Sequence, residues 1–254
     1  MERFGALVDL DAIRSLRLLV AGLGRVGMAV LKRVMEWPIA SITAIDHDHV
    51  SAKEEGSVFP YGARGQQKVF AAEQIVKAWN PEIAYEGVVM HLQKTNLETF
   101  AGYVDKSDVL LFLADDFSLL SDIARVCHGQ LPIIATGIGE QGAYAEVAWS
   151  FPNHRMSCVA CALNARQRQS EAGAASLPSD TDLVAHVVVS CAIGIAVAGR
   201  KGYSLFQELL EPSHSLILIH NRKNRFTSST SQLVAKVVRL VSTAKLSCDV
   251  CRRR

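Results

Sequence analysis

Two Cys-x-x-Cys pairs, far apart in the sequence, place the strongest constraint on how this chain can fold. They are Cys158-Val-Ala-Cys161 and Cys248-Asp-Val-Cys251. Each pair puts two thiols within reach of one cation, and four thiolates make the closed tetrahedral set of a structural zinc site. We therefore predict a structural zinc ion that fastens the second pair to the body of the protein. Two separate dithiols, redox-active or simply reduced, are the alternative.

The composition argues against several classes of protein. The 254 residues carry 27 basic and 25 acidic side chains, so the net charge of +2 predicts neither nucleic-acid binding nor a basic membrane-binding patch. The longest apolar run, residues 184–198, contains His186 and is too short to span a membrane. Paired thiols without a secretory signal at the N-terminus lead us to expect a cytoplasmic protein.

Short apolar runs alternate with helical segments through the first 140 residues. Strands buried on both faces read as continuous apolar stretches, and these are expected at 17–21, 42–45, 83–89, 108–113 and 132–135. Helices are expected at 28–37, 69–79, 97–104 and 119–128. This alternation predicts an α/β fold with a doubly wound, mostly parallel, Rossmann-like sheet.

Beyond residue 140 the pattern changes, and we expect a mixed extension of the sheet. The predicted elements are a strand at 142–150, a crossover loop at 164–182, a helix at 183–199, and a hairpin of 216–220 with 225–229. No linker is long enough to divide the chain. The prediction is therefore one domain over 1–254, with a nucleotide-binding half at 1–140 and the extension at 141–254.

A glycine-rich turn lies between the first strand and the first helix. Gly22, Gly24 and Gly27 form Gly-x-Gly-x-x-Gly, which lets the backbone approach a phosphate at a helix N-terminus. Asp46 ends the next strand, where a carboxylate can accept ribose hydroxyls. Arg25, inside the turn, is a candidate for a further phosphate contact. The pattern predicts nucleotide binding and fits NAD, FAD or ATP.

Further motifs follow the turn. Lys68 opens a helix in Gly65-Gln-Gln-Lys68, Asp115 lies at a strand tip in Ala114-Asp115-Asp116, and the two cysteine pairs come after them. In this order the motifs resemble those of the ubiquitin-activating-enzyme superfamily. The chain most resembles the bacterial and archaeal members that adenylate sulfur-carrier proteins for thiamine and molybdopterin synthesis. The resemblance covers about residues 16–251.

The resemblance implies a role for each motif. The glycines match the ATP phosphate loop, and Asp46 matches the ribose-binding aspartate. Lys68 matches the lysine that holds the ATP phosphates, Asp115 matches the aspartate tied to magnesium, and the four cysteines match the zinc ligands. Lys68 and Asp115 would be catalytic, because charge that develops at the phosphates must be offset.

The resemblance also implies partners. These are a second copy of the chain in a homodimer, and an acceptor that supplies the carboxylate. The acceptor would be the C-terminus of a small ubiquitin-like carrier, or a small-molecule carboxylate such as the guanylylpyridinol of one branch of the family.

The sequence departs from the family between the ribose aspartate and the lysine. Members carry an Asn-x-x-Arg-Gln stretch whose arginine contacts the triphosphate, and residues 51–64 contain no such stretch. Lys53 and Arg64 are the candidates to replace that arginine, as is a residue of a partner subunit. Residues 47–49, His-Asp-His, are assigned no role, and Asp48 is expected to face solvent.

A thioester-forming cysteine is not evident. Apart from the predicted zinc ligands, Cys127 lies on a predicted helix and Cys191 in a core-like run, where a thiol is inert. Ser170 stands where the family segment carries its cysteine. We therefore expect the reaction to stop at the acyl-adenylate.

Two other functions remain open at this point. An NAD(P)-dependent oxidoreductase would use the same glycine turn and Asp46, but it leaves the lysine and the cysteine pairs unexplained. A non-catalytic nucleotide-binding scaffold of the same fold would account for the missing arginine.

Overall fold

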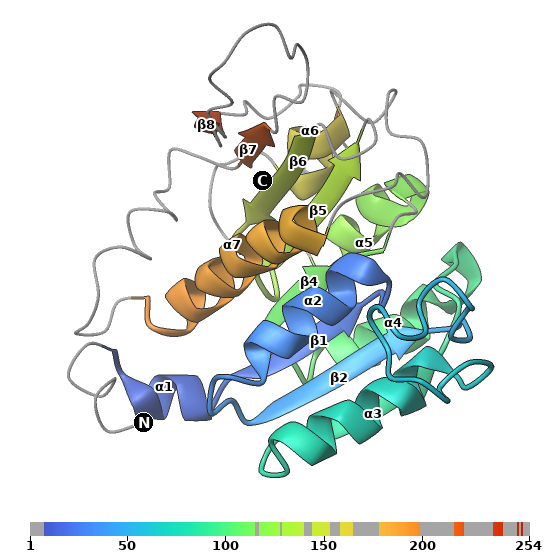
Figure 1. Cartoon of the computed structure of the whole chain (residues 1–254). Helices are drawn as coiled ribbons and strands as arrows, with labels where there is room; N and C mark the ends of the chain where they lie inside the picture. Colours follow the sequence, from blue (N-terminus) through green and yellow to red (C-terminus); the bar gives the residue numbers. More distant parts are fainter. Residues whose placement is uncertain are drawn as a thin grey trace, which may run out of the picture.

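The computed structural model describes most of the chain, which Figure 1 shows in colour. The described residues are 8–114, 117–127, 129–139, 144–152, 158–164, 178–198, 216–220, 236–240, 248 and 250. The strands are β1 (Arg17–Ala21), β2 (Ser41–Asp46), β3 (Ala84–Val89), β4 (Val109–Phe112), β5 (Ile133–Gly139), β6 (Tyr144–Ser150), β7 (Leu216–His220) and β8 (Lys236–Leu240). The helices are α1 (Leu10–Arg14), α2 (Arg25–Val34), α3 (Lys68–Trp79), α4 (Leu97–Val104), α5 (Leu120–Val126), α6 (Val159–Asn164) and α7 (Pro178–Ala196), with short 3-10 turns at η1 (Lys94–Asn96) and η2 (Phe117–Leu119).

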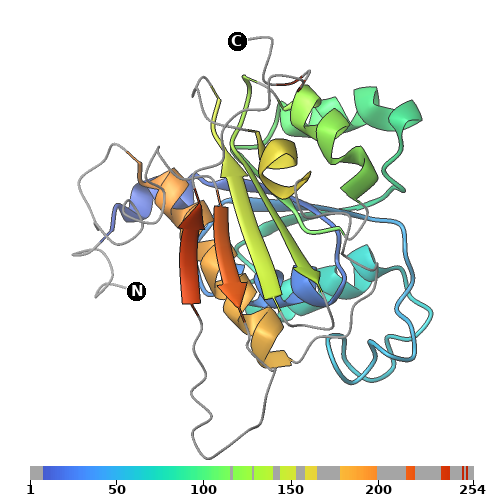
Figure 2. The ribbon, with the colours of Figure 1, turned by 90° about the horizontal axis from the view of Figure 1, so that it is seen from above.

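The eight described strands form one sheet in the order β3-β2-β1-β4-β5-β6-β7-β8. The first five strands in sequence pair in parallel, while β6, β7 and β8 are added antiparallel. Figure 2 shows β7 and β8 extending the sheet beside β6. The chain winds outward from β1 in one direction to β3 and then in the other to β5. This order confirms the predicted α/β fold with its doubly wound parallel part and mixed extension.

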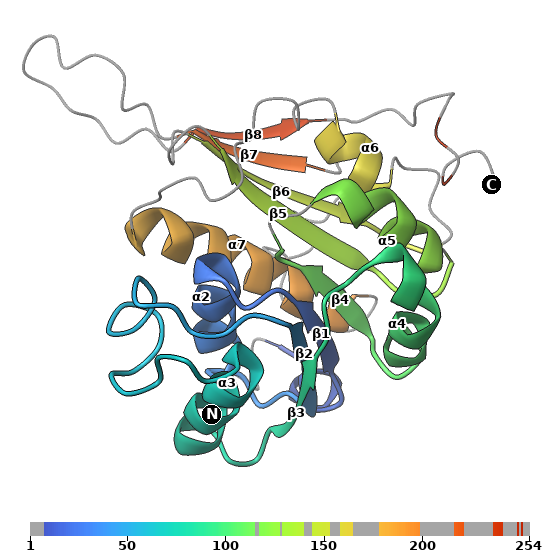
Figure 3. The ribbon, with the colours of Figure 1, turned by 90° about the vertical axis from the view of Figure 1, so that its right-hand side faces the viewer.

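Helices cover both faces of the sheet, because each central strand is apolar on both sides. Leu18 and Val20 of β1 belong to a core with residues of α2, α3 and α7, whereas Leu19 and Ala21 belong to a second core with residues of α4, α5 and α6. Figure 3 shows these two helical layers on opposite sides. Successive side chains of a strand point to opposite faces, so one short apolar run contributes to both cores.

The C-terminal extension differs in detail from the prediction. The partner of β7 in the hairpin is β8 rather than residues 225–229, which lie outside the described residues. The run at 236–240 has two adjacent valines and a strand-like composition, but its pairing with 216–220 depends on a long connection that the sequence pattern does not reveal. Helix α7 begins at Pro178, inside the predicted crossover loop, because proline is well tolerated in the first turn of a helix. Among the described residues, no helix is long and apolar enough to cross a membrane.

The core on the α4–α5–α6 face should be sensitive to cavities. Phe112 on β4 is 1% exposed, so Phe112→Ala should lower the free energy of unfolding by about 3–5 kcal/mol in a denaturant titration. Phe70→Ala is the matched control, because Phe70 is 48% exposed. Equal effects of the two substitutions would contradict this placement of the core.

Candidate functional site

The glycine turn is packed against the end of β4. Gly22 has a φ of +100°, and a Cβ built on it would lie 2.6 Å from the backbone nitrogen of Ala114. A Cβ on Gly27 would lie 2.1 Å from the carbonyl oxygen of Gly22. Both positions therefore exclude side chains, because backbone atoms occupy the space.

Gly24 has a different environment from the other two glycines. A Cβ there would meet no described atom within 4 Å, and no side chain caps the first turn of α2. The N–H groups that begin a helix have no partner within the helix. The turn thus leaves open space beside a helix N-terminus, the arrangement that suits a phosphate group.

Asp46 joins the end of β2 to the glycine turn. Its side chain accepts hydrogen bonds from the backbone N–H of Leu23 at 2.6 Å and from that of Asp48 at 2.8 Å. The residue is 9% exposed. A carboxylate has about four acceptor positions, so both oxygens keep capacity for a ligand hydroxyl. The structure therefore brings together the turn predicted to bind phosphate and the carboxylate predicted to bind ribose.

Lys68 begins α3, and its ammonium group is enclosed by carboxylates. Its side chain is 8% exposed, and Nζ lies 2.9 Å from Glu54 Oε1 and 3.1 Å from Asp48 Oδ2. Burial lowers the pKa of Lys68, but the hydrogen bond to Glu54, the nearby charge of Asp46 and the hydrogen bond to Asp48 outweigh it, so the pKa is raised. Lys68 is therefore a buried, permanent cation beside the predicted ribose carboxylate.

Glu54 was not identified from the sequence. Burial raises its pKa, but the hydrogen bonds from Lys68 and Ser51 outweigh burial, and the net pKa is lowered. Its Oε2 accepts from the backbone N–H of Ser51 at 2.9 Å and from the Ser51 hydroxyl at 2.7 Å. The Ser-x-x-Glu spacing predicts the local hydrogen bonds between Ser51 and Glu54, but it does not predict the contact of Glu54 with Lys68.

Two neighbouring residues have contacts that the sequence did not predict. Asp48 was expected to face solvent, and its side chain is 52% exposed, but it is also paired with Lys68. His47, to which no role was assigned, stacks on His91 with ring centroids 4.0 Å apart, and its Nε2 lies 3.3 Å from Asp48 Oδ1. The strand ends of β2 and β3 bring His47 and His91 together, which a linear pattern does not reveal.

The structure places three of the four remaining residues that were predicted to contact the nucleotide, and the fourth lies outside the described residues. The Arg25 guanidinium lies 3.5 Å from the Ser57 hydroxyl, so it reaches toward the segment between Asp48 and Lys68. Lys53 and Arg64 are both exposed on that segment. Asp115 lies outside the described residues, and its role stays a prediction.

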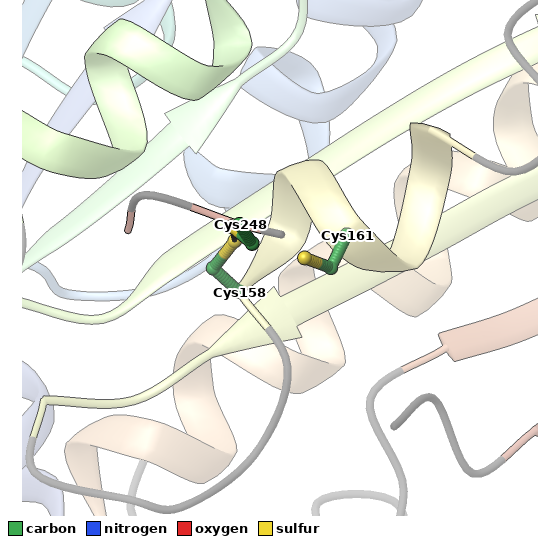
Figure 4. Close-up of side chains that lie close together, drawn as sticks. All are labelled: Cys158, Cys161 and Cys248. Atoms are coloured by element: carbon green, nitrogen blue, oxygen red, sulfur yellow. Dashed lines mark hydrogen bonds between the residues drawn. The ribbon is translucent and has the colours of Figure 1, made fainter. Parts of the chain in front are cut away.

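Three of the four predicted zinc ligands lie together. The sulfur atoms of Cys158, Cys161 and Cys248 are within 4.8 Å of one another (Figure 4). Cys158 and Cys161 are buried around the start of α6, and the sulfurs of Cys158 and Cys248 are 3.7 Å apart, too far for a disulfide. Cys251 lies outside the described residues. Three soft sulfur donors at this spacing fit a zinc ion.

The other two cysteines are poor nucleophiles. Cys127 and Cys191 are buried, and desolvation raises the pKa of each thiol to about 12. The reactive form of cysteine is the thiolate, which is disfavoured in both places.

The chain matches the model of the ThiF family over residues 2–233, and it therefore belongs to this family. It is similar to ubiquitin-like modifier-activating enzyme 5 of Gallus gallus, with 25% identity over 213 residues, covering 74% of this chain and 52% of that protein. The same enzyme of Dictyostelium discoideum is 22% identical over 256 residues, covering 88% and 67%. The chain thus spans about half the length of the Gallus gallus protein. The predicted superfamily resemblance is confirmed.

Solved structures share the fold. E. coli MccB, solved with ATP, has a TM-score of 0.72 and 17% identity, and the match covers 95% of this chain and 68% of MccB. The microcin C7 biosynthetic enzyme MccB has also been solved in complex with N-formylated MccA. PaaA has a TM-score of 0.66 and 14% identity, covering 85% of this chain and 73% of PaaA. At these identities the likeness establishes the fold.

The glycine turn yields a test based on stability. Gly27→Ala should unfold at a temperature several degrees below the wild type, because its Cβ would meet a backbone oxygen at 2.1 Å. Gly24→Ala should unfold close to the wild-type temperature, since its Cβ enters open space. Thermal unfolding by circular dichroism measures both. Equal losses at Gly24 and Gly27 would contradict this geometry.

Proposed function

We propose that the chain is an ATP-dependent adenylyltransferase that activates a carboxylate. The observation that carries the proposal is the buried, charged Lys68 beside Asp46 and the glycine turn. A phosphate-binding turn, a ribose-binding carboxylate and a fixed cation are the groups that a nucleoside triphosphate requires. Membership of the ThiF family and the fold shared with MccB, solved with ATP, support ATP as the nucleotide.

The chemistry joins the acceptor carboxylate to ATP. A carboxylate oxygen forms a bond to the α-phosphorus, the bond from that phosphorus to the bridging oxygen breaks, and pyrophosphate leaves with the electron pair. Lys68 Nζ and the N–H groups at the start of α2 stabilise the charge on the phosphate oxygens, and Asp46 holds the ribose. Magnesium bound with ATP would neutralise further charge, and Asp115 is the residue proposed to hold it.

The acceptor is proposed from the relatives. The Gallus gallus protein is named as an enzyme that activates a ubiquitin-like modifier, and MccB was solved with MccA. We favour the C-terminal carboxylate of a small protein or peptide, with a small-molecule carboxylate as the alternative. The raised pKa values of Cys127 and Cys191 support a reaction that ends at the acyl-adenylate. A homodimer in the cytoplasm completes the proposal.

The adenylation step is tested by exchange of labelled pyrophosphate into ATP, with magnesium and a panel of peptide and small-molecule carboxylates. Lys68→Ala should lower the exchange rate by about 10²- to 10³-fold, the usual effect of removing one transition-state donor. Lys77→Ala is the matched control, because Lys77 is an exposed lysine on the same helix that pairs with Glu73. Equal rates for the two variants would contradict the assigned role of Lys68.

We assign the zinc ion to the four cysteines, with Cys251 as the fourth ligand. The ion would hold the segment of Cys248 against α6, and it would have no part in the chemistry because its ligand set is closed. The observation in support is the convergence of Cys158, Cys161 and Cys248 without a disulfide.

Metal analysis of the purified protein tests this assignment. We expect about one zinc per chain, and Cys158→Ser should lose most of it and unfold at a lower temperature. Cys191→Ala is the control, because Cys191 is also buried but belongs to the core on the other face of the sheet, and the zinc content of this variant should not change. Full zinc occupancy in Cys158→Ser would exclude the four-cysteine site.

A further inference from the structure

Residues 51–65 form a compact loop between Asp48 and Lys68, which we call the 51–65 loop. Its backbone is held internally: the Glu54 carbonyl accepts from the N–H groups of Ser57, Val58 and Phe59 at 2.9–3.1 Å. The side chains of Phe59 and Ala63 are buried in the core with α2 and α3. The loop is therefore a preformed structure, fixed to the body of the protein by apolar contacts.

Two polar contacts of this loop with the body involve cations that are candidates to bind phosphate, Lys68 and Arg25. Glu54 contacts Lys68 Nζ at 2.9 Å, and the Ser57 hydroxyl lies 3.5 Å from Arg25. The Glu54 carboxylate cannot turn away freely, because its second oxygen is held by the N–H and hydroxyl of Ser51. The loop thus presents a fixed anion to the lysine that the phosphates need.

The charges around Lys68 strengthen this conclusion. Glu54 and Asp48 contact the ammonium directly, and the charge of Asp46 also acts on it. Three carboxylates face one cation, so the surroundings carry excess negative charge before any nucleotide arrives. A triphosphate must therefore compete with Glu54 for Lys68. The Glu54 carboxylate also repels the triphosphate, and this repulsion is substantial at short range in a partly buried site.

From these contacts we infer that Glu54 sets the affinity of the site for ATP, by occupying Lys68 until a phosphate oxygen replaces it. Glu54 acts through Lys68 and is not itself a catalytic residue. The inference rests on the proposed function, since it assumes that Lys68 binds the phosphates. It also gives the 51–65 loop a role, which is to carry the anion that competes with phosphate for Lys68.

The test is Glu54→Gln, which keeps the shape of the side chain and an acceptor oxygen but removes the charge. Calorimetric titration with magnesium-ATP should give a Kd about tenfold lower than that of the wild type. The unfolding temperature without nucleotide should fall by a few degrees, because Lys68 loses one partner of a buried ion pair. Replacing a residue with a merely structural role would weaken ATP binding and lower the unfolding temperature together. Tighter ATP binding with a lower unfolding temperature therefore distinguishes the proposed role from a structural one.

Glu55→Gln is the matched control in the same loop. Glu55 Oε1 accepts from the backbone N–H of Gly62 at 2.7 Å, and glutamine can still accept this bond. The Kd of Glu55→Gln should stay within about twofold of the wild type, because ordinary surface substitutions have small effects. Tighter binding in both variants would mean a general effect of loop charge and would overturn the specific role of Glu54.

Lys68→Ala separates this inference from the proposed function. If Lys68→Ala weakens ATP binding and abolishes the effect of Glu54→Gln in the double variant, the proposed roles of Lys68 and Glu54 are both supported. If Lys68→Ala weakens binding but Glu54→Gln leaves it unchanged or weaker, the role of Glu54 is wrong and the ATP site stands. If Lys68→Ala leaves ATP binding unchanged, Lys68 does not bind the phosphates, and both the proposed role of Lys68 and the inference about Glu54 are wrong.

Discussion

The structure depends on close backbone packing where the chain reverses its winding between β1 and β4. Gly27 lies against the carbonyl of Gly22, and Gly22 lies against the backbone of Ala114. These contacts set the distance between α2 and the two central strands, and only glycine fits them. Ligands of doubly wound sheets bind outside the carboxyl ends of the strands at such a reversal. The same turn leaves open space beside Gly24, where we propose that the nucleotide binds.

The groups around this opening are fixed by mutual contacts. Asp46 accepts a hydrogen bond from the N–H of Leu23, so the carboxylate that we propose binds the ribose is tied to the glycine turn that we propose binds the phosphates. Lys68 is held by Glu54 and Asp48, which keep it charged despite its burial. Catalysis of adenylation needs positioned charge more than covalent chemistry, so groups fixed in advance suit the proposed reaction. We propose that Glu54 also competes with a triphosphate for Lys68, which would link the structure of the 51–65 loop to nucleotide affinity.

The sequence predicted the parallel part of the fold well, because continuous apolar runs such as Leu18–Val20 can be satisfied only by burial on both faces. It also pointed to three cysteines that lie together, because the Cys-x-x-Cys spacing is a local signal of a shared metal. It failed where the determining contact is distant in sequence. Glu54 is an ordinary loop glutamate until Lys68 is placed beside it, and the choice of β8 as the partner of β7 depends on a long connection. The cysteine and strand signals are local, whereas these two contacts depend on the tertiary structure.

The central claim is that the site binds ATP, and parallel calorimetric titrations of the zinc-loaded protein with magnesium-ATP and with NAD test it most directly. The same glycine turn and ribose aspartate would serve an NAD-dependent oxidoreductase, so the two nucleotides separate the alternatives. We expect magnesium-ATP to bind in the micromolar range and NAD to bind at least about tenfold more weakly, since NAD lacks the terminal phosphate that Lys68 would hold. Tight binding of NAD without binding of ATP would contradict the account and place the protein among the dehydrogenases.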